Sequence, residues 1–258
     1  MNLKYPKITV VTPSYNQAPF LKMTLESILN QDYPNLEYIV IDGGSTDGSV
    51  DILRQYDKQL TYWVSEPDQG QTDALNKGFL RATGDILCWL CSDDLFESWT
   101  LKEVAQFFQD NPQARVVYGD STWIDVEGQP LRIKKELPFN RFIFLYSHNF
   151  IPQPSTFWRR DLYEEVGGLN SEFDLAMDAD LWMRFSEVTD FYHVRRSWSK
   201  MRLYPEQKTQ RLSVRSREEG RMIEQRYCGE EPMWSFKVKK FLATSLRVGW
   251  KLAAGNYW

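Results

Sequence analysis

The feature that most constrains the fold is a cycle of an apolar strand-like segment, a polar turn and a helix-like segment, which occurs four times in the first 110 residues. The strand-like segments are rich in apolar and β-branched residues, and the segments after the turns have apolar residues at helical spacing. Strands that alternate with helices pair in parallel, with helices on both faces of the sheet. The sequence therefore predicts an α/β fold with a Rossmann-like, mostly parallel sheet. The predicted strands are residues 8–12, 36–42, 60–66 and 84–90.

In such a sheet, ligands bind beyond the carboxyl ends of the strands. We therefore expect the loops after the four strands to line one site. Residues 1–120 carry 17 acidic and 9 basic groups, and acidic groups that converge on a cleft would attract a metal ion. The four loops are residues 13–17, 42–48, 66–73 and 91–95.

After residue 114 the alternation becomes less regular. Two strands joined by a turn, a further strand and several helices are expected from the apolar spacing and the glycine breakers. We divide the chain into a domain over 1–205 and a helical, basic C-terminal extension over 206–258. The later strands are expected within 114–132 and at 153–160, and the helices at 159–166, 178–188, 209–227 and 233–252.

Composition excludes several classes of protein. With 42% apolar and 26% charged residues the chain is not disordered, and three cysteines make no disulfide framework. The first residues lack a signal peptide's apolar stretch, and no apolar run is long enough to span a bilayer. We therefore expect a cytoplasmic globular protein. A net charge of −4 and the lack of a binding motif argue against nucleic acid as a partner.

Asp93 and Asp94 directly follow the fourth predicted strand, at the ligand edge of the sheet. Two carboxylates there are placed to bind a hard divalent cation that bridges phosphate oxygens. Taken alone, the two residues are better explained by a solvated turn or a cap of the helix that begins near Ser98.

A glycine-rich turn at 42–48 follows the second predicted strand. Its glycines let a ligand approach the backbone, and Asp42 can accept a hydrogen bond from a base or a ribose. The turn lacks the full spacing of a dinucleotide or P-loop motif, so by itself it is weak evidence for either.

Five strings occur in order: VVTPSYNQ at 10–17, VIDGGSTDGS at 40–49, the block from SEPDQG to LCSDD at 65–94, QPSTFWRRDLYEEVGGL at 153–169 and MDADLWMRF at 177–185. Together they resemble glycosyltransferase family 2. The resemblance implies a GT-A fold, a nucleotide-diphosphate-sugar donor, a divalent cation (Mn2+ or Mg2+) and transfer with inversion. Residues 1–120 would form the nucleotide-sugar-binding half, and 121–205 the acceptor and catalytic half.

The resemblance also implies roles for residues in the loops. Pro13, Tyr15 and Asn16 match the loop that lies against the nucleotide base, and Asp42 matches the carboxylate that contacts uracil or ribose. Lys77 is expected near the pyrophosphate, where a point positive charge helps. The donor-binding candidates are Pro13, Tyr15, Asn16, Asp42, Gly43, Asp73, Asn76, Lys77, Ser92 and Asp93, and the metal-binding candidates are Asp93 and Asp94.

Inversion requires a carboxylate that accepts the proton of the attacking hydroxyl, on the face opposite the leaving group. The resemblance places Asp178 at the second member of the family's Glu-Asp pair, so Asp178 is the preferred catalytic base, ahead of Asp180. The two residues cannot point the same way on a helix. The alternative is that one of them only caps the helix.

Two positions depart from the family's pattern. Cys91 stands where many members have Asp or Asn, and Tyr204 stands where many have His. The metal site could therefore be weak, or completed by water. Arg202 and Lys208 are candidates to hold the diphosphate, although exposed basic residues are more often only solvated.

Three further features receive mainly structural interpretations. Cys88 and Cys91 form a CxxC string, but residues three apart on a strand face opposite sides, which disfavours a redox or zinc role. His148 could border the acceptor pocket, although a structural or surface role is favoured. Trp89, Trp158 and Trp182 lie in apolar contexts and are expected in the core.

The segment 233–252 has five basic residues and no acidic one. Lys237, Lys239, Lys240, Arg247 and Lys251 alternate with large apolar residues, which suits an amphipathic helix that lies on an anionic membrane and would fit a lipid-linked acceptor. Equally, the helix could pack against the catalytic domain with a solvated basic face.

The sequence thus predicts a metal-dependent, inverting, hexosyltransferase-like enzyme that moves a sugar from UDP to a hydroxyl of a glycan or lipid-linked saccharide, in polysaccharide or cell-envelope biosynthesis. A non-catalytic nucleotide- or glycan-binding module is the alternative that Cys91 and Tyr204 suggest. A sugar nucleotidyltransferase is a weaker alternative, because the loop after the first strand lacks the glycine-rich, basic sequence that binds a triphosphate.

Overall fold

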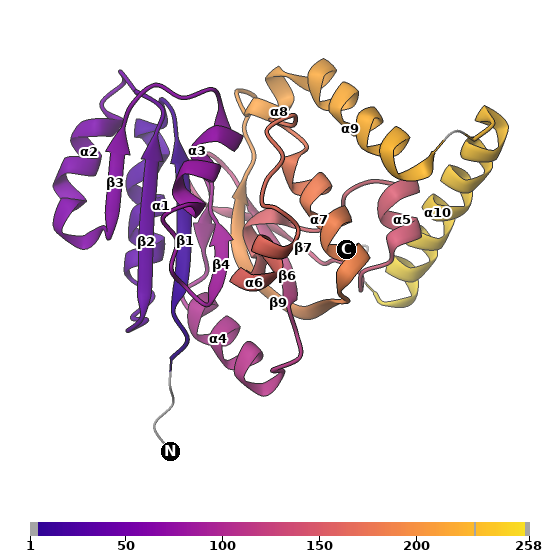
Figure 1. The fold of residues 1–258 in the computed structure, drawn as a ribbon, viewed down its shortest axis with the longest axis horizontal. Coiled ribbons are helices and arrows are strands. Elements are labelled where there is room, and N and C mark those ends of the chain that lie inside the picture. Colours follow the sequence, from indigo (N-terminus) through magenta and orange to yellow (C-terminus); the bar gives the residue numbers. More distant parts are fainter. Residues whose placement is uncertain (1–4, 230, 256–258) are drawn as a thin grey trace.

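The computed structural model describes residues 5–229 and 231–255. Within these residues nine strands form one mixed sheet, and helices cover both of its faces (Figure 1). The strand order is β3-β2-β1-β4-β8-β6-β9-β5, with β7 paired to β6. The strands are β1 Ile8–Ser14, β2 Leu36–Asp42, β3 Tyr62–Ser65, β4 Ile86–Trp89, β5 Leu95–Phe96, β6 Val116–Ile124, β7 Pro130–Lys134, β8 Thr156–Arg159 and β9 Phe191–Arg202.

The predicted α/β fold is confirmed, because the first four strands are parallel and are joined by helices. Every residue of β1 is buried, as expected of a central strand with helices on both sides. The helices are α1 Ala18–Leu29, α2 Ser49–Tyr56, α3 Gln71–Phe79, α4 Thr100–Asp110, α5 Arg141–Tyr146, α6 Arg160–Glu165, α7 Met177–Val188, α8 Lys208–Arg211, α9 Ser213–Cys228 and α10 Met233–Ala253, with short 3-10 turns at Asp57–Gln59 and Gln153–Ser155.

Three elements are missing from the sequence prediction: β5, α5 and β9. The long strand β9 pairs in parallel with β6 and antiparallel with β5. It carries exposed Arg195 and Arg196 in its middle, so it lacks the clean apolar alternation that marks a strand. Its pairing across the sheet, and not its local pattern, makes it a strand.

The core contains the three tryptophans expected there. Trp89, Trp158 and Trp182 are all buried, and the Trp89 and Trp182 rings stack with centroids 5.9 Å apart. These residues come from β4, β8 and α7, so the cluster joins the parallel half of the sheet to the helix that carries Asp178. Position within the fold, and not sugar stacking, explains them.

The C-terminal helices lie on the side of the molecule opposite α2 (Figure 1). There α9 lies beside the start of α7, and α10 packs along α5. In the part of the chain that the structure describes, every helix is too short or too polar to cross a bilayer.

Candidate functional site

The four loops at the carboxyl ends of β1 to β4 lie together, as predicted. Asn16 joins the first loop to the second, since its amide donates to Ser45 Oγ (2.8 Å) and its Oδ1 accepts from the Thr46 amide (2.9 Å). Asn16 has φ 51°, a left-handed conformation that Asn tolerates better than most residues. Gln71 Nε2 donates to Cys91 Sγ (3.2 Å) and so links the third loop to the fourth.

Asp42 fixes the shape of the glycine-rich turn. It is fully buried, and its carboxylate accepts from the Ser45 amide (2.9 Å), Ser45 Oγ (2.6 Å) and Ser65 Oγ (2.7 Å). Of the two neighbours in the first loop, Pro13 belongs to buried β1, whereas the Tyr15 side chain is 63% exposed. Tyr15 therefore has a ring that is free to lie against a base.

Asp68 is a residue at this edge to which the sequence analysis gave no role. A Cβ atom at Gly43 would lie only 2.6 Å from Asp68 Oδ2, so the absence of a side chain at Gly43 makes room for this carboxylate. Asp68 also accepts from the Gly70 amide (2.9 Å), and burial raises its pKa. The only signal in the sequence was that Gly43 and Asp68 occupy neighbouring loops.

The candidates on α3 are held by neighbouring side chains. Lys77 Nζ lies 3.2 Å from Glu66 Oε1 and 3.3 Å from Asp73 Oδ2. Asn76 donates from Nδ2 to the Leu169 carbonyl (3.2 Å), which ties α3 to the segment after α6. Lys77 is thus paired with two carboxylates, and Asn76 has a structural contact.

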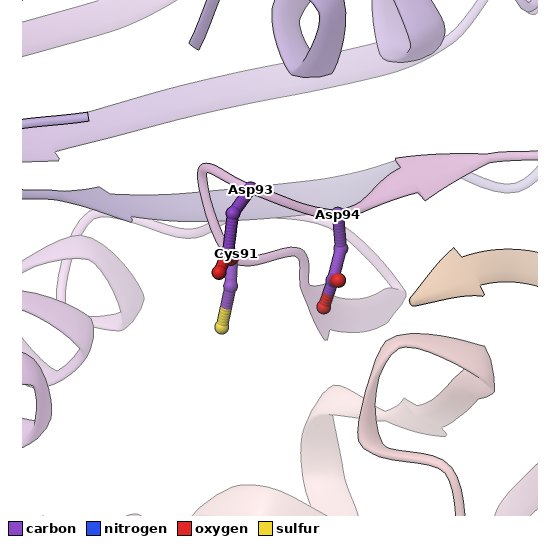
Figure 2. Close-up of side chains that lie close together, drawn as sticks. All are labelled: Cys91, Asp93 and Asp94. Atoms are coloured by element: carbon purple, nitrogen blue, oxygen red, sulfur yellow. The ribbon is translucent and has the colours of Figure 1, made fainter. Parts of the chain in front are cut away.

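The acidic pair lies just beyond β4. Ligand atoms of Cys91, Asp93 and Asp94 lie within 4.8 Å of one another, and Figure 2 shows the three side chains on the same side of the loop. Burial, and then the neighbouring Asp93, raises the pKa of Asp94 well above its usual value, and burial also raises the pKa of Asp93. A divalent cation would remove the repulsion that keeps both from ionising. Ser92, between Cys91 and Asp93 in the chain, is buried and accepts from Thr24 Oγ1 through its carbonyl (2.9 Å).

The two carboxylates fit a hard cation better than the thiol does. Cys91 Sγ accepts from Gln71 and donates to Gln153 Oε1 (3.7 Å), and burial, followed by Asp93 and Asp94, raises its pKa well above the usual value. The thiol is therefore neutral and already paired. Oxygen ligands from Asp93 and Asp94 are the donor set that Mg2+ and Mn2+ prefer.

Tyr204 takes part in the site although it replaces a histidine of the family pattern. Its hydroxyl donates to Asp93 Oδ2 (2.8 Å) and accepts from Gln17 Nε2 (3.4 Å). Burial, and then Asp93, raises the pKa of Tyr204, so the hydroxyl stays a neutral donor. Tyr204 thus orients Asp93 and connects it to the first loop.

The two basic candidates for the diphosphate differ. Arg202 is fully buried, and its guanidinium donates to the carbonyls of Asp93 (2.9 Å) and Asp125 (2.8 Å). The expectation that Arg202 holds a phosphate is therefore wrong, because its donors are used to fix the loop backbone. Lys208 is about a third exposed and lies 2.9 Å from Asp174 Oδ2 and 3.3 Å from Gln71 Oε1.

Asp178 lies in the first turn of α7 and lines a cavity of about 470 Å³ between α5, α7 and α9. Its carboxylate accepts from Asn149 Nδ2 (2.8 Å) and from the Ala179 amide (2.8 Å). Burial raises the pKa of Asp178 to about 6. His148 and Glu224 line the same cavity. At neutral pH the group is ionised and is a stronger base than an ordinary aspartate.

Asp180 has a different environment. It is fully buried, and it accepts from Arg184 Nε (2.9 Å) and from Arg226 Nη1 (3.1 Å), on α7 and α9. Its charge is thus neutralised inside the protein. The structure places the two aspartates in separate surroundings, with only Asp178 at the cavity.

Glu219, on α9, is a further residue that the sequence analysis missed. It is buried, and its Oε2 accepts from the backbone amides of Asp174 (3.0 Å), Leu175 (2.7 Å) and Ala176 (2.9 Å). The C-terminal extension thereby fixes the loop that leads into Asp178. One Glu among several in a helix of mixed charge gives no sign of such a role, because the three amides that it binds lie more than 40 residues away in the chain.

Comparisons with known proteins agree with this geometry. Among solved structures, the Pyrobaculum calidifontis mannosyltransferase PcManGT in complex with GDP-Man and Mn2+ superimposes with a TM-score of 0.66 at 20% identity, over 98% of this chain and 77% of that chain. Staphylococcus aureus TarS 1–349 in complex with UDP has a TM-score of 0.63 at 22% identity, over 77% of this chain. This chain spans 61% of the TarS chain. At these identities, the likeness shows the fold.

Sequence comparison reaches closer relatives. An uncharacterized glycosyltransferase of Mycobacterium tuberculosis is 31% identical over 189 residues, which is 72% of this chain and 71% of the relative. A PGL/p-HBAD biosynthesis glycosyltransferase of Mycobacterium bovis is 32% identical over 197 residues, or 73% of this chain and 75% of the relative. The profile of Glycosyl transferase family 2 matches residues 9–167. This chain therefore belongs to glycosyltransferase family 2, with the GT-A-like fold, and is a nucleotide-sugar-dependent glycosyltransferase.

Proposed function

We propose that the enzyme transfers a sugar from UDP, with a bound Mn2+ or Mg2+, to a hydroxyl of a glycan or lipid-linked saccharide of the cell envelope. The observation that carries the proposal is the arrangement of two carboxylate sites. Asp93 and Asp94 lie at the carboxyl edge of the sheet, where the nucleotide would bind. Asp178 lines the cavity between α5, α7 and α9, and burial raises the pKa of its carboxyl group to about 6. In this proposal residues 1–120 bind the donor and 121–205 bind the acceptor.

Two structural neighbours support the donor class. TarS is described in complex with UDP and with UDP-GlcNAc, and PcManGT in complex with GDP-Man and Mn2+. UDP-GlcNAc and GDP-Man are both nucleotide-diphosphate sugars. The choice of UDP rests on Asp42, which matches the family's carboxylate for uracil or ribose, with Tyr15 exposed beside it.

Asp93 and Asp94 would hold the cation, and a bound cation would neutralise the charge that develops on the departing diphosphate. Tyr204 keeps Asp93 oriented by its hydrogen bond. Lys208 lies beside Gln71 and is partly exposed, whereas Arg202 is buried. We therefore assign to Lys208 the role of binding the phosphates of the donor.

Asp178 would accept the proton of the acceptor hydroxyl as that oxygen attacks the anomeric carbon. Asn149 donates to Oδ2 and the Ala179 amide donates to Oδ1, so each carboxylate oxygen keeps a second lone pair for a group in the cavity. The proton then resides on Asp178 Oδ until solvent removes it. Asp180 takes no part in this step, since both of its arginine partners neutralise it.

Calorimetric titration of UDP, GDP and dTDP, with and without Mn2+, tests the donor. We expect metal-dependent binding of UDP, loss of that binding in Asp93→Ala and Asp94→Ala, and its retention in Asp178→Asn. Tight binding of GDP alone would overturn the UDP assignment. Binding of UDP-sugar with no release of UDP in the presence of any acceptor would instead favour the non-catalytic module.

A further inference from the structure

Helix α10 turns its large apolar side chains outward. Trp234, Val238, Phe241 and Leu252 recur at intervals that place them on one face of the helix. The Trp234 and Phe241 side chains are 72% and 71% exposed, and Val238 and Leu252 are each at least half exposed. Isolated exposed apolar residues are normal, but a row of this kind, which only Ser245 and Gly249 interrupt on the same face, indicates a surface that contacts something apolar.

The opposite face of α10 is attached to the protein mainly by polar contacts. Lys239 Nζ donates to Tyr146 Oη (3.1 Å), Arg247 Nε donates to Ser147 Oγ (3.1 Å), and Lys251 Nζ lies 3.2 Å from Glu136. Packing of α10 against the rest of the protein, one of the two alternatives expected from the sequence, is confirmed, but these three basic side chains contact the protein instead of forming a fully solvated face. They hold α10 against α5 and against the segment that follows β7, and the apolar row stays exposed on the other side of the helix.

We propose that the outward face of α10 binds the surface of a membrane that contains anionic phospholipids. The exposed Lys237 and Lys240 lie on one side of the apolar row, and residues 233–253 contain no acidic side chain, so this part of the helix is complementary to negative headgroups. Trp234 suits the boundary between acyl chains and headgroups, because indole is apolar with one polar N–H. The helix would lie in the interface plane, since it is not apolar enough to span a bilayer.

Helix α10, which carries this surface on its outward side, packs against a helix that lines the cavity of Asp178. Helix α5 packs against α10 (Figure 1), and the α5 residues Phe144 and Leu145 line the cavity. Ser147, which accepts from Arg247 of α10, also lines the cavity. A membrane bound to α10 would therefore hold a lipid-linked saccharide close to Asp178, a consequence that rests on the proposed function.

Co-sedimentation of the full chain with vesicles tests the membrane surface. We expect binding to phosphatidylcholine vesicles that contain phosphatidylglycerol, and much weaker binding to phosphatidylcholine alone. Lys237→Ala with Lys240→Ala should weaken binding about 30-fold, since each lysine near an anionic surface contributes roughly a factor of five. Phe241→Glu should weaken it by about tenfold or more, because it places a charge in the apolar row.

Leu80→Glu is the matched control, since Leu80 is 88% exposed and directly follows α3, a helix that lies far from α10 in Figure 1. It should bind vesicles like the native chain. Absence of vesicle binding by the native chain would overturn the proposal, and so would equal binding by Phe241→Glu. A native dimer that Phe241→Glu dissociates, seen by light scattering without vesicle binding, would assign the face to a second copy instead.

Failure of this proposal is distinguishable from failure of the proposed function. Metal-dependent UDP binding by Phe241→Glu should equal that of the native chain, because the partners of α10, Tyr146, Ser147 and Glu136, lie outside the carboxyl-edge loops. Vesicle binding without UDP binding would support the membrane-binding role of α10 and overturn the assignment of UDP as the donor nucleotide. UDP binding without vesicle binding would do the opposite.

Discussion

The carboxyl edge of the sheet and helix α10 arrange their side chains in opposite ways. At the edge, apolar strands are buried and the polar loops are joined by hydrogen bonds such as those of Asn16 and Asp42. On α10, the basic Lys239, Arg247 and Lys251 bind the rest of the protein, whereas the rings of Trp234 and Phe241 are exposed. The first region is complete within this chain, and only a ligand is needed to fill it. The second leaves apolar surface uncovered, which indicates a partner outside the chain.

Asp178→Asn should have the largest effect. Removing the base should lower kcat by about 10² to 10⁴-fold, because a neutral amide cannot accept the proton. Donor binding should be unchanged by calorimetry. In an assay with a soluble acceptor and no membrane, variants on α10 should keep their kcat. A comparable loss of kcat in Phe241→Glu would contradict the view that α10 serves only to bind a partner outside the chain.

Asp180→Asn is the matched control for that variant. It should keep most of the activity but lower the free energy of unfolding by about 1–3 kcal/mol, since Arg184 and Arg226 lose a charged partner. Urea denaturation measures the stability. If Asp180→Asn were inactive while stable, and Asp178→Asn active, the assignment of the base would be reversed.

The same truncation in the two regions should differ in its cost. Phe157→Ala, at a fully buried position on β8, should cost about 3–5 kcal/mol of unfolding free energy. Phe241→Ala on α10 should change it by no more than about 0.5 kcal/mol, because the ring is already in water. If Phe157→Ala and Phe241→Ala lowered the urea midpoint of unfolding equally, the outward face of α10 would be covered in solution.

Glu219→Gln should have an intermediate effect, since Glu219 joins the C-terminal extension to the loop before Asp178. We expect a loss of about 1–3 kcal/mol from the weakened bonds to three amides, and a lower kcat with an unchanged KM for the donor. Glu218→Gln, at an exposed neighbouring position, is the control. An unchanged kcat in a stable Glu219→Gln would remove Glu219 from the positioning of Asp178.

The pH dependence should show the smallest effect. Because burial raises the pKa of Asp178 to about 6 in the free protein, kcat/KM, which reports on the free enzyme, should fall by up to about tenfold per pH unit below that value as the base is protonated. The raised pKa means that the folded state binds this proton more tightly than the unfolded state. The associated stability is therefore present at low pH and is lost as the pH rises through about 6.

Thermal unfolding checks the sign of that linkage. The melting temperature of Asp178→Asn relative to the native protein should increase between about pH 4 and pH 7, because only the native side chain loses its stabilising proton there. A pH-independent difference would mean that Asp178 titrates normally. Donor binding over the same range separates this titration from that of Asp93 and Asp94.

Much of the fold and part of the site followed from local pattern. The four strands of the parallel half, the position of their loops and the buried tryptophans were all predictable, because burial on both sides of a sheet requires apolar runs and the loops must follow the strands. Strand β9 and helix α5 were not, since they depend on partners far away in the sequence.

What the sequence determined by itself was which residue types stand at the ends of the strands: Asp42, Asp93 and Asp94 are there in any α/β arrangement of this chain. Only the tertiary structure decided what each charge meets. Asp178 and Asp180 are two residues apart, yet one lines a cavity and the other pairs with two arginines. The physical reason is that the energy of a charged group depends on distances to groups many residues away, and spacing along the chain does not contain those distances.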